Sequence, residues 1–432
     1  MKKIQSQTLR LEKIVGGGQA LGQLDDGKKA FVWGGLPGET VTIDVTKKKS
    51  HFVEGIVTSV SEPSVERIDP KDPESYLSTS PWQIMSFEAE QRYKAALIEE
   101  AFELHDIVVP EPIDVYTDGN QYGYRNKIEF SWWWDTESEQ LDLAFFRRGT
   151  HGKIPVEGTS LATSAITDAA HKLRHVLRER QTEGRDLKTV IIRSNREGGV
   201  VAQLYVKEKD FLPLSETELT QLGIQGFELI FSNPKSPASV ITRRLQSWGD
   251  IVLRDTILDI PFTYAAEGFF QINLPVYERA LRDMKEWIEP GKPTVDLYSG
   301  VGTIGLTIGG PQITLIESNE HAVREMEQNI HSLDRDDSAT AILAPSEKAL
   351  DYITGDACVI VDPPRAGLHE DVIDTLLEEA PERIIYLSCN PVTQARDVAR
   401  LAVRYGIRAH RGYNFFPRTP HIEHLIVLDR KS

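Results

Sequence analysis

The sequence predicts a doubly wound α/β domain in the C-terminal part of the chain, preceded by a small β-barrel and a central α+β domain. From residue 293 onward, apolar strands alternate with helical segments, which is the pattern of a mostly parallel sheet. Residues 8–60 hold about five short strands separated by glycine turns, as in a small barrel. Residues 113–262 consist mainly of strand-like segments, with one helix near 161–182.

The domain boundaries follow from changes in composition. Residues 61–80 are rich in Pro, Ser and charge and are typical of a linker, and a helical pattern begins at about Phe87. We therefore expect a barrel at 1–62, a linker and central domain at 63–262, and the doubly wound domain at 263–432. A helix near 87–104 is expected to pack on the C-terminal domain.

The overall composition is that of a globular protein, with 432 residues, of which 40% are hydrophobic and 26% charged. No stretch approaches the roughly 18 apolar residues of a membrane helix, and the start has no apolar signal region. The two cysteines, Cys358 and Cys389, exclude a disulfide framework and indicate a reducing cytoplasm. No heptad pattern appears, so we expect a monomer without membrane contact.

The charge is unevenly distributed. The chain has a net charge of −16, which excludes a uniformly basic nucleic-acid binder. Residues 1–60 nevertheless hold nine Lys or Arg against six Asp or Glu, so this segment is positive and the remainder strongly acidic. A basic module before an acidic body is compatible with RNA binding at one face. A solvated hairpin end at Lys47–Lys49 is an equally compatible interpretation.

A glycine-rich turn at residues 296–305 (DLYSGVGTIG) follows a strand and opens a helix. Its glycines allow a ligand to approach the backbone closely. Glu317 ends the next strand, about 20 residues further on, where a carboxylate can accept hydrogen bonds from ribose hydroxyls. NAD binding is a rival interpretation, but Asp296 in the first strand favours a cationic methionine group over a phosphate.

Two further motifs follow strands of the same domain. In VDPPR, a carboxylate at Asp362 can accept from N3–H of uracil, whereas cytosine has an acceptor there. In LSCNP, Cys389 comes at the end of a strand and before a helix led by Pro391, a position that lowers a thiol pKa and suits a nucleophile. Cys358 lies inside an apolar strand and is expected to be a buried core residue.

The last two motifs lie near the two ends of the C-terminal domain. Glu423, in FPRTPHIEH, precedes an apolar strand and is a candidate base, and Gln271, in FFQIN, stands where an amide can contact both cofactor and base. Phe269, Phe270 and Phe416 are candidates to pack around a base, or else ordinary core residues. No metal site is predicted, because His421 and His424 have no partners at metal-ligand spacing.

Together, FFQIN, DLYSGVGTIGL, VDPPRAGL, LSCNP and FPRTPHIE resemble, in order and spacing, the uridine-C5 RNA methyltransferases, which act on 23S ribosomal RNA and on the T-loop of transfer RNA. The resemblance implies a Rossmann-like class I methyltransferase domain, S-adenosylmethionine as cofactor, and RNA as partner. Residues 1–60 resemble a TRAM domain, an RNA-binding barrel, and Tyr124–Lys127 resembles a segment of the family's central domain. The residue roles that it implies are Cys389 as nucleophile, Glu423 as base, Gln271, Tyr298, Thr303, Glu317 and Asp362 as cofactor-binding residues, and Asp362, Gln271 and Arg365 as substrate-binding residues.

The sequence departs from the family in two places. Ribosomal-RNA members often carry four cysteines that bind an iron–sulfur cluster just after the TRAM domain, but residues 69–83 contain no cysteine, and the chain has only two. A four-thiolate cluster is therefore excluded. The residue after the third strand that is commonly Asp or Asn falls near Pro345, so the adenine contact stays unassigned.

The RNA target is less sharply indicated than the chemistry. A TRAM domain favours 23S ribosomal RNA, and the T-loop of transfer RNA is the alternative. A cytosine-C5 methyltransferase would share the covalent chemistry but conflicts with a carboxylate at Asp362. A non-catalytic RNA-binding factor of the same fold and an NAD(P)-dependent oxidoreductase are the remaining alternatives.

Overall fold

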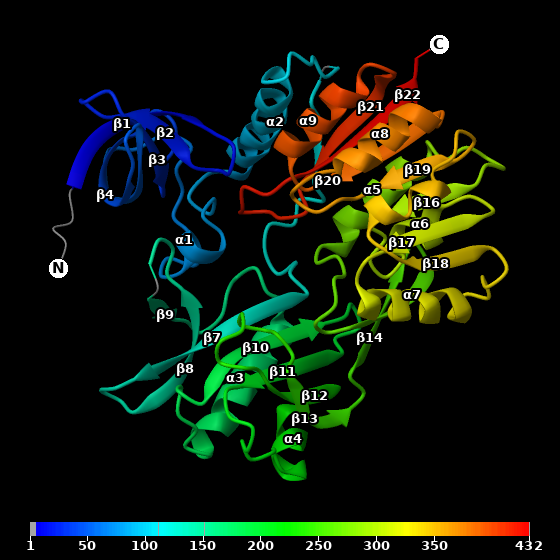
Figure 1. Cartoon of the computed structure of the whole chain (residues 1–432). Helices are drawn as coiled ribbons and strands as arrows, with labels where there is room; N and C mark the ends of the chain where they lie inside the picture. Colours follow the sequence, from blue (N-terminus) through cyan, green and yellow to red (C-terminus); the bar gives the residue numbers. More distant parts are fainter. Residues whose placement is uncertain (1–5, 111, 151, 432) are drawn as a thin grey trace.

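A computed structural model describes residues 6–110, 112–150 and 152–431, which form a barrel, a central sheet and a large C-terminal sheet (Figure 1). Residues 1–5, which include Lys2 and Lys3 of the basic segment and the start of the expected barrel domain, lie outside the described residues.

The barrel is closed, with its five strands in the order β1-β2-β3-β5-β4. Along each strand buried apolar residues alternate with exposed ones, because successive side chains point to opposite faces. Val32, Val41 and Ile43 are fully buried in its interior. The predicted N-terminal barrel is thereby confirmed. Its strands are β1 (Ser6–Ile14), β2 (Ala20–Gln23), β3 (Lys29–Trp33), β4 (Thr40–Lys48) and β5 (Phe52–Glu62).

A linker connects the barrel to the rest of the chain through α1 (Tyr76–Thr79) and α2 (Phe87–Glu103). Ser86 caps α2 by accepting a hydrogen bond from the Ala89 amide, as helix N-termini require. Asp72 ties the linker to the central domain, because its carboxylate accepts from the amide and hydroxyl of Ser160 and from the Gln83 amide.

The central domain is a seven-stranded sheet in the order β13-β12-β11-β10-β7-β8-β9. Helix α3 covers one face and buries Ile166, Ala170, Leu173 and Leu177, which recur at helical spacing. The elements are β7 (Lys127–Asp135), β8 (Gln140–Phe146), β9 (Lys153–Pro155), α3 (Ser164–Glu179), β10 (Leu187–Ser194), β11 (Val200–Val206), α4 (Glu216–Leu222), β12 (Gly226–Phe231) and β13 (Arg243–Gly249). A hairpin of β14 (Val252–Ile257) and β15 (Ile260–Ala265) leads from this sheet to the C-terminal domain.

The C-terminal domain is an eight-stranded sheet in the order β18-β17-β16-β19-β20-β22-β21-β6. Its first five strands are parallel, β22 is antiparallel to both β20 and β21, and β6 pairs in parallel with β21 at the edge. The strands are β6 (Val115–Tyr116), β16 (Thr294–Leu297), β17 (Ile313–Glu317), β18 (Ala339–Leu343), β19 (Cys358–Val361), β20 (Arg383–Ser388), β21 (Tyr405–Tyr413) and β22 (Glu423–Arg430).

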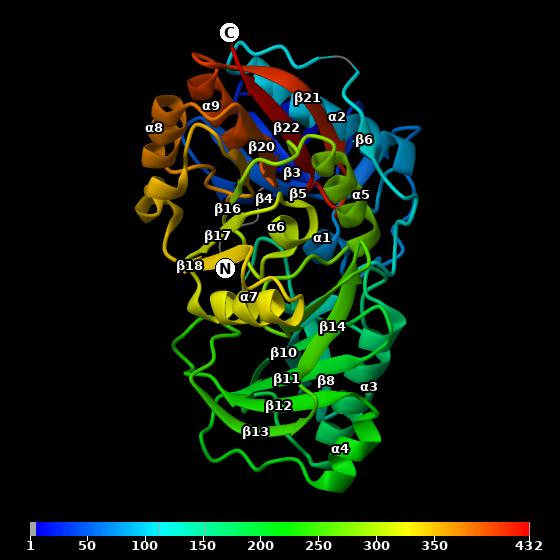
Figure 2. The same ribbon diagram turned by 90° about the vertical axis from the view of Figure 1, so that its right-hand side faces the viewer.

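Helices cover both faces of this sheet, as the doubly wound pattern predicts (Figure 2). One core is formed with α5, α6 and α7, and the other with α8, α9 and the linker helix α2. The helices are α5 (Leu274–Lys285), α6 (Thr303–Ile308), α7 (Glu320–Ser332), α8 (Glu370–Glu379) and α9 (Pro391–Leu401). The predicted fold class, a Rossmann-like domain behind a barrel and an α+β domain, is confirmed.

Among the described residues, none of the helices combines the length and the apolar composition that crossing a bilayer requires.

Candidate active site

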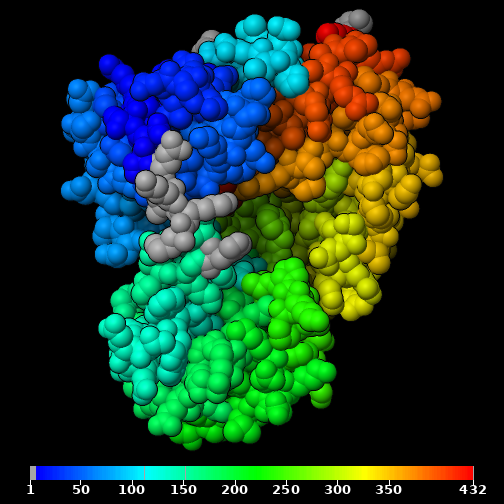
Figure 3. All heavy atoms as spheres, turned by 60° about the vertical axis from the view of Figure 1, so that its left-hand side comes forward, coloured from blue at the N-terminus to red at the C-terminus, as the bar shows by residue number. Residues whose placement is uncertain are grey.

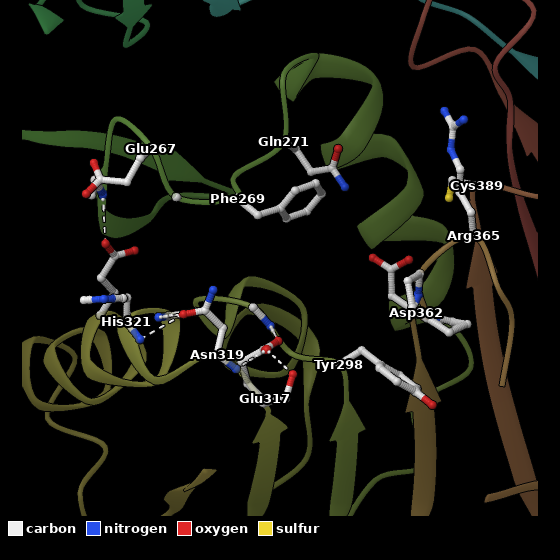
Figure 4. A pocket seen from close by; sticks show the side chains of 18 of the residues that line it. Glu267, Phe269, Gln271, Tyr298, Glu317, Asn319, His321, Asp362, Arg365 and Cys389 are labelled. Atoms are coloured by element: carbon white, nitrogen blue, oxygen red, sulfur yellow. Dashed lines mark hydrogen bonds between the residues drawn. The ribbon is translucent and has the colours of Figure 1, made fainter. Parts of the chain in front are cut away.

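A cavity of about 1580 Å³ opens at the carboxyl ends of the parallel strands, where ligands of doubly wound sheets bind. The space-filling view shows a hollow in the surface between the barrel, the central domain and the C-terminal domain (Figure 3). Of the eight residues to which the family resemblance gives catalytic, cofactor-binding or substrate-binding roles, seven line this cavity, and several of them are labelled in Figure 4. They are Gln271, Tyr298, Glu317, Asp362, Arg365, Cys389 and Glu423.

Glu317 is held in place by its own neighbours. One carboxylate oxygen accepts from the Gly300 amide at 3.0 Å, and the other accepts from the Asn319 amide at 2.7 Å (Figure 4). Gly300 has φ +56°, and a Cβ added there would meet no atom within 4 Å. The turn therefore leaves open space beside a fixed carboxylate, which fits the ribose of a nucleoside.

Tyr298 lines the same part of the cavity with φ +64°, a left-handed conformation that is rare for an aromatic residue. Burial raises the pKa of its phenol, and the Ser346 side chain and the His369 backbone oppose this. Pro345 and Ser346 also line the cavity. The segment whose adenine contact the sequence leaves unassigned thus faces the site.

Two polar residues of the glycine-rich segment, Thr303 and Asp296, make hydrogen bonds within the protein. Thr303 begins α6 and shares a hydrogen bond of 2.8 Å with the Tyr277 hydroxyl, and it does not line the cavity. Asp296 is fully buried and accepts from the Gly305 amide at 2.8 Å, and burial raises its pKa to about 8. Both side chains support the turn from within, and the cofactor-binding role expected of Thr303 stays a prediction.

Cys389 lies between the end of β20 and the start of α9, half-buried at the cavity. Burial raises the pKa of its thiol to about 12, the charges of Glu423 and Asp362 add to this, and Arg365 opposes it. The sequence predicts a lowered thiol pKa from the helix N-terminus. In the folded chain that effect is outweighed by desolvation and by two neighbouring carboxylates.

The two carboxyl groups at the site are themselves strongly perturbed. Burial raises the pKa of Asp362 to about 7. Burial also raises the pKa of Glu423 well above its ordinary value, and the charge of Asp362 raises it further. Two buried carboxyl groups that hinder one another's ionisation are typical of acid–base sites.

Arg365 supplies positive charge and joins two motifs. Its backbone carbonyl accepts from the Asn390 side chain at 2.8 Å and from Thr393 Oγ1 at 3.1 Å, so the loop after β19 is tied to the loop after β20. Its Nη2 donates to Nδ1 of His421 at 3.3 Å. Burial and the charge of Arg365 lower the pKa of His421 to about 4, so the ring is a neutral acceptor.

Of the three aromatic candidates, two face the cavity. Phe416 and Phe269 line it, and Phe269 is 70% exposed. Phe270 is buried and stacked on Tyr264 with ring centroids 3.9 Å apart, so it is a core residue. Gln271, which directly follows Phe270, is buried and lines the wall of the cavity.

Two residues without a role predicted from the sequence, Arg125 and His421, also line the cavity. Arg125 reaches the cavity from the central domain, with its guanidinium 5.9 Å from the centroid of the Phe416 ring. His421 reaches it from the segment before β22. The resemblance of Tyr124–Lys127 to a family segment is the only signal in the sequence that points to Arg125. In the described part of the chain, no group of three or more His, Cys, Asp or Glu is arranged to hold a metal ion.

Comparisons with known proteins agree with this geometry. Residues 350–431 match the family model for tRNA (uracil-5-)-methyltransferases, and residues 5–58 match the TRAM domain. A protein of Enterococcus faecalis named as an uncharacterized RNA methyltransferase is 29% identical, with 93% of this chain and 92% of that protein covered. One of Lactiplantibacillus plantarum, named in the same way, is 28% identical over 94% of this chain and 93% of that protein.

The fold is shared with a solved structure. The Pyrococcus abyssi tRNA (uracil-54, C5)-methyltransferase in complex with S-adenosyl-L-homocysteine superposes with a TM-score of 0.78 at 22% identity, covering 97% of this chain and all of that one. The chain thus carries a TRAM domain and a tRNA (uracil-5-)-methyltransferase family domain, and it is an RNA methyltransferase.

Proposed function

We propose that the protein methylates C5 of a uridine in RNA through a covalent bond between Cys389 and C6 of the base, with S-adenosylmethionine as the methyl donor. The observation that carries this proposal is the convergence of a thiol, Cys389, and two carboxyl groups, Asp362 and Glu423, on one cavity beside the fixed carboxylate of Glu317.

The residues at the glycine-rich turn fit S-adenosylmethionine. Glu317 is oriented by two backbone amides and can accept the ribose hydroxyls, while Tyr298 and Gln271 line the adjoining walls. The open space at Gly300 admits a ligand close to the backbone. When bound, this cofactor supplies the methyl group as an electrophile.

Asp362 and Arg365 are suited to hold the uracil ring. An ionised Asp362 accepts from N3–H, and Arg365 and Gln271 are donors at the same cavity that can reach ring oxygens. C5 and C6 are inaccessible in a stacked helix, so the nucleotide must be flipped out or belong to a loop. The size of the cavity, about 1580 Å³, allows a cofactor and a nucleotide together.

The chemistry then follows from the positions of Cys389 and Glu423. The thiolate of Cys389 adds to C6, and the π electrons of the C5–C6 bond move into the ring as an enolate, which nearby donors stabilise. C5 becomes nucleophilic and forms a bond to the methyl carbon, while the bond from that carbon to the sulfonium sulfur breaks and S-adenosylhomocysteine is the leaving group. Glu423 removes the C5 proton, the electron pair of that C–H bond restores the double bond, and the C6–S bond breaks to release Cys389.

We further propose 23S ribosomal RNA as the substrate, with the T-loop of transfer RNA as the alternative. The TRAM domain motivates the ribosomal choice, although the iron–sulfur cysteines that often accompany it are missing from this sequence. The tRNA (uracil-54, C5)-methyltransferase that shares the fold over 97% of this chain supports the alternative. We also propose that the protein acts in the cytoplasm as a monomer. Its three domains are proposed to meet at about residues 62 and 262.

The test is a covalent trap. Purified protein, S-adenosylmethionine and RNA containing 5-fluorouridine are mixed and separated under denaturing conditions. Fluorine cannot leave C5 as a cation, so a protein–RNA band should accumulate. Cys389→Ala should abolish the band, whereas Cys358→Ala, which changes a buried cysteine of β19, should retain it.

Running the trap with ribosomal RNA and transfer RNA separately, and sequencing the trapped fragment, identifies the target. A band that survives in Cys389→Ala would contradict the assigned nucleophile. The absence of any band with either RNA, together with no affinity for S-adenosylhomocysteine, would contradict the whole proposal and favour a non-catalytic RNA-binding role.

A further inference from the structure

The N-terminal barrel touches the segments that carry both proposed catalytic residues. The turn between β1 and β2 lies so close to Pro420 that a Cβ added at Gly18 would come within 2.1 Å of its Cβ. A Cβ at Gly16 would lie 3.9 Å from the side chain of Val392. Pro420 precedes Glu423 by three residues, and Val392 follows Cys389 by three. The barrel therefore packs against the rim of the active site.

Trp82 makes this contact specific. Its side chain is 2% exposed, and the indole N–H donates to the Gly18 carbonyl at 3.0 Å. Its backbone amide donates to the Arg418 carbonyl at 3.1 Å. One buried residue of the linker is thus hydrogen-bonded to the barrel turn and to residues 414–422, the catalytic loop between β21 and β22.

The catalytic loop has no helix or strand of its own, so its path depends on side chains from elsewhere. The Phe415 carbonyl accepts from Asn273 at 3.1 Å, the Phe416 carbonyl from the ammonium of Lys94 at 3.2 Å, and the Pro417 carbonyl from the Tyr124 hydroxyl at 2.9 Å. The barrel turn completes this set through Trp82 and Pro420. These contacts hold the segment that carries Phe416 and His421, and the segment leads directly into Glu423, the first residue of β22, whose backbone pairs with Tyr413 of β21.

We propose that the barrel has a role in the reaction besides any binding of RNA: Gly18 and Trp82 are positioning residues that hold the catalytic loop so that Glu423 can reach the C5 proton. This inference rests on the proposed function. Cys389 is fixed mainly by β20, α9 and the loop at Arg365. Loss of the barrel contact should therefore affect proton removal more than addition of the thiolate.

This difference has a measurable signature. If Glu423 is displaced after the methyl group has arrived, the C6–S bond cannot break, and the methylated protein–RNA adduct accumulates with ordinary uridine. A general loss of stability would instead lower adduct formation and release together. The fraction of enzyme found as adduct with unmodified RNA, measured beside kcat and KM, separates the two.

Two pairs of full-length variants supply the test. Gly17 and Gly18 have φ of +90° and +89°, so alanine is equally strained at both, but a Cβ at Gly17 meets nothing within 4 Å. Gly18→Ala is the test and Gly17→Ala its control. Trp82→Phe removes the indole donor that bonds the Gly18 carbonyl of the barrel turn, and Trp248→Phe removes an indole donor that bonds Glu216 at 3.0 Å in the central domain.

We expect Gly18→Ala and Trp82→Phe to lower kcat on the order of tenfold to a hundredfold, the range typical of small displacements of catalytic groups, and to accumulate the methylated adduct. Gly17→Ala and Trp248→Phe should resemble the unchanged protein. Should the unchanged protein turn over while the test variants match their controls, or raise KM alone, the inference is overturned. Equal losses in adduct formation and release, with a lower melting temperature, would also overturn it. An unchanged protein that neither methylates nor traps RNA would instead refute the proposed function.

Discussion

Cys389 and Glu423 are neighbours across two antiparallel strands. Ser388, the last residue of β20, pairs with His424 of β22, so the next residue outward on each strand is Cys389 on one and Glu423 on the other. Both therefore emerge at the same edge of the sheet and line the same cavity. The antiparallel strand β22, added beside the parallel ones, places a carboxyl group opposite the thiol.

The reactivity of Cys389 should depend on the charges around it. Because the charge of Glu423 raises the thiol pKa and that of Arg365 lowers it, Glu423→Gln should shift the alkylation of Cys389 by iodoacetamide to lower pH. Arg365→Gln should shift it to higher pH. The measurement is the alkylation rate at Cys389 as a function of pH, read by mass spectrometry.

Cys358, which is 1% exposed, serves as the internal reference in that experiment, since it should stay unmodified in the folded protein. Shifts of the same sign in the two variants would contradict the electrostatic explanation.

Replacing Glu423 by Gln should stabilise the fold at neutral and alkaline pH. The carboxyl group holds its proton more tightly in the folded than in the unfolded chain, since burial raises its pKa well above 4.5. Its ionisation therefore opposes folding, and this cost grows as pH rises above 4.5 towards the folded-state pKa. The melting temperature of Glu423→Gln should exceed that of the unchanged protein at pH 8, and the gain should vanish near pH 4.

Glu378→Gln, at an exposed position of α8, is the matched control and should leave the melting curves unchanged at both pH values. A gain of equal size at pH 4 and pH 8 would mean that the substitution acts through packing and not through ionisation.

Glu317 should dominate the affinity for the cofactor. Glu317→Ala removes a carboxylate that two backbone amides hold at the cavity, so S-adenosylhomocysteine should bind about tenfold or more weakly in calorimetry. The control is Glu320→Ala, which changes an exposed residue of α7 that pairs with Arg324 on the same helix. Unchanged affinity in Glu317→Ala would remove this residue from the cofactor site.

A buried ionic cluster that contacts the catalytic loop should contribute strongly to the stability of the fold. Lys94 and Glu90 of α2 are fully buried and 3.0 Å apart, and Glu90 also accepts from the Arg418 amide at 3.0 Å. Lys94→Met leaves a buried carboxylate without one of its cations, which should lower the free energy of unfolding by about 3 kcal/mol in urea titrations.

The matched control lies on the same helix. Arg92 pairs with Glu66 at an exposed position, so Arg92→Met should lower the free energy of unfolding by less than about 1 kcal/mol. An equal free energy of unfolding in the two variants would mean that the buried cluster does not stabilise the fold more than an exposed ion pair does. Adding Glu90→Gln to Lys94→Met should recover part of the loss, because the unpaired charge is then removed.

The parts of the fold that could be predicted from the sequence are those with strong local periodicity. The expected alternation of strands and helices after residue 293 is present from Thr294 to Leu401, because these elements combine apolar runs with clear turns or caps. The barrel was predictable for the same reason. Helix α5 and strand β6 were not predicted, since the first follows directly on the FFQIN motif and the second is a two-residue pairing with β21.

For the candidate active site, too, some features were predictable from the sequence and others were not. The sequence by itself determined which residues can carry the chemistry, because the glycine-rich turn, the DPPR loop and the thiol at Cys389 are local patterns at the ends of strands. Only the tertiary structure decided their surroundings. It joined Thr303 to the Tyr277 hydroxyl, raised the thiol pKa that the helix N-terminus alone would lower, and brought the barrel turn at Gly18 against the loop before Glu423. Desolvation, charge and contact between distant segments depend on three-dimensional proximity, which local sequence patterns do not encode.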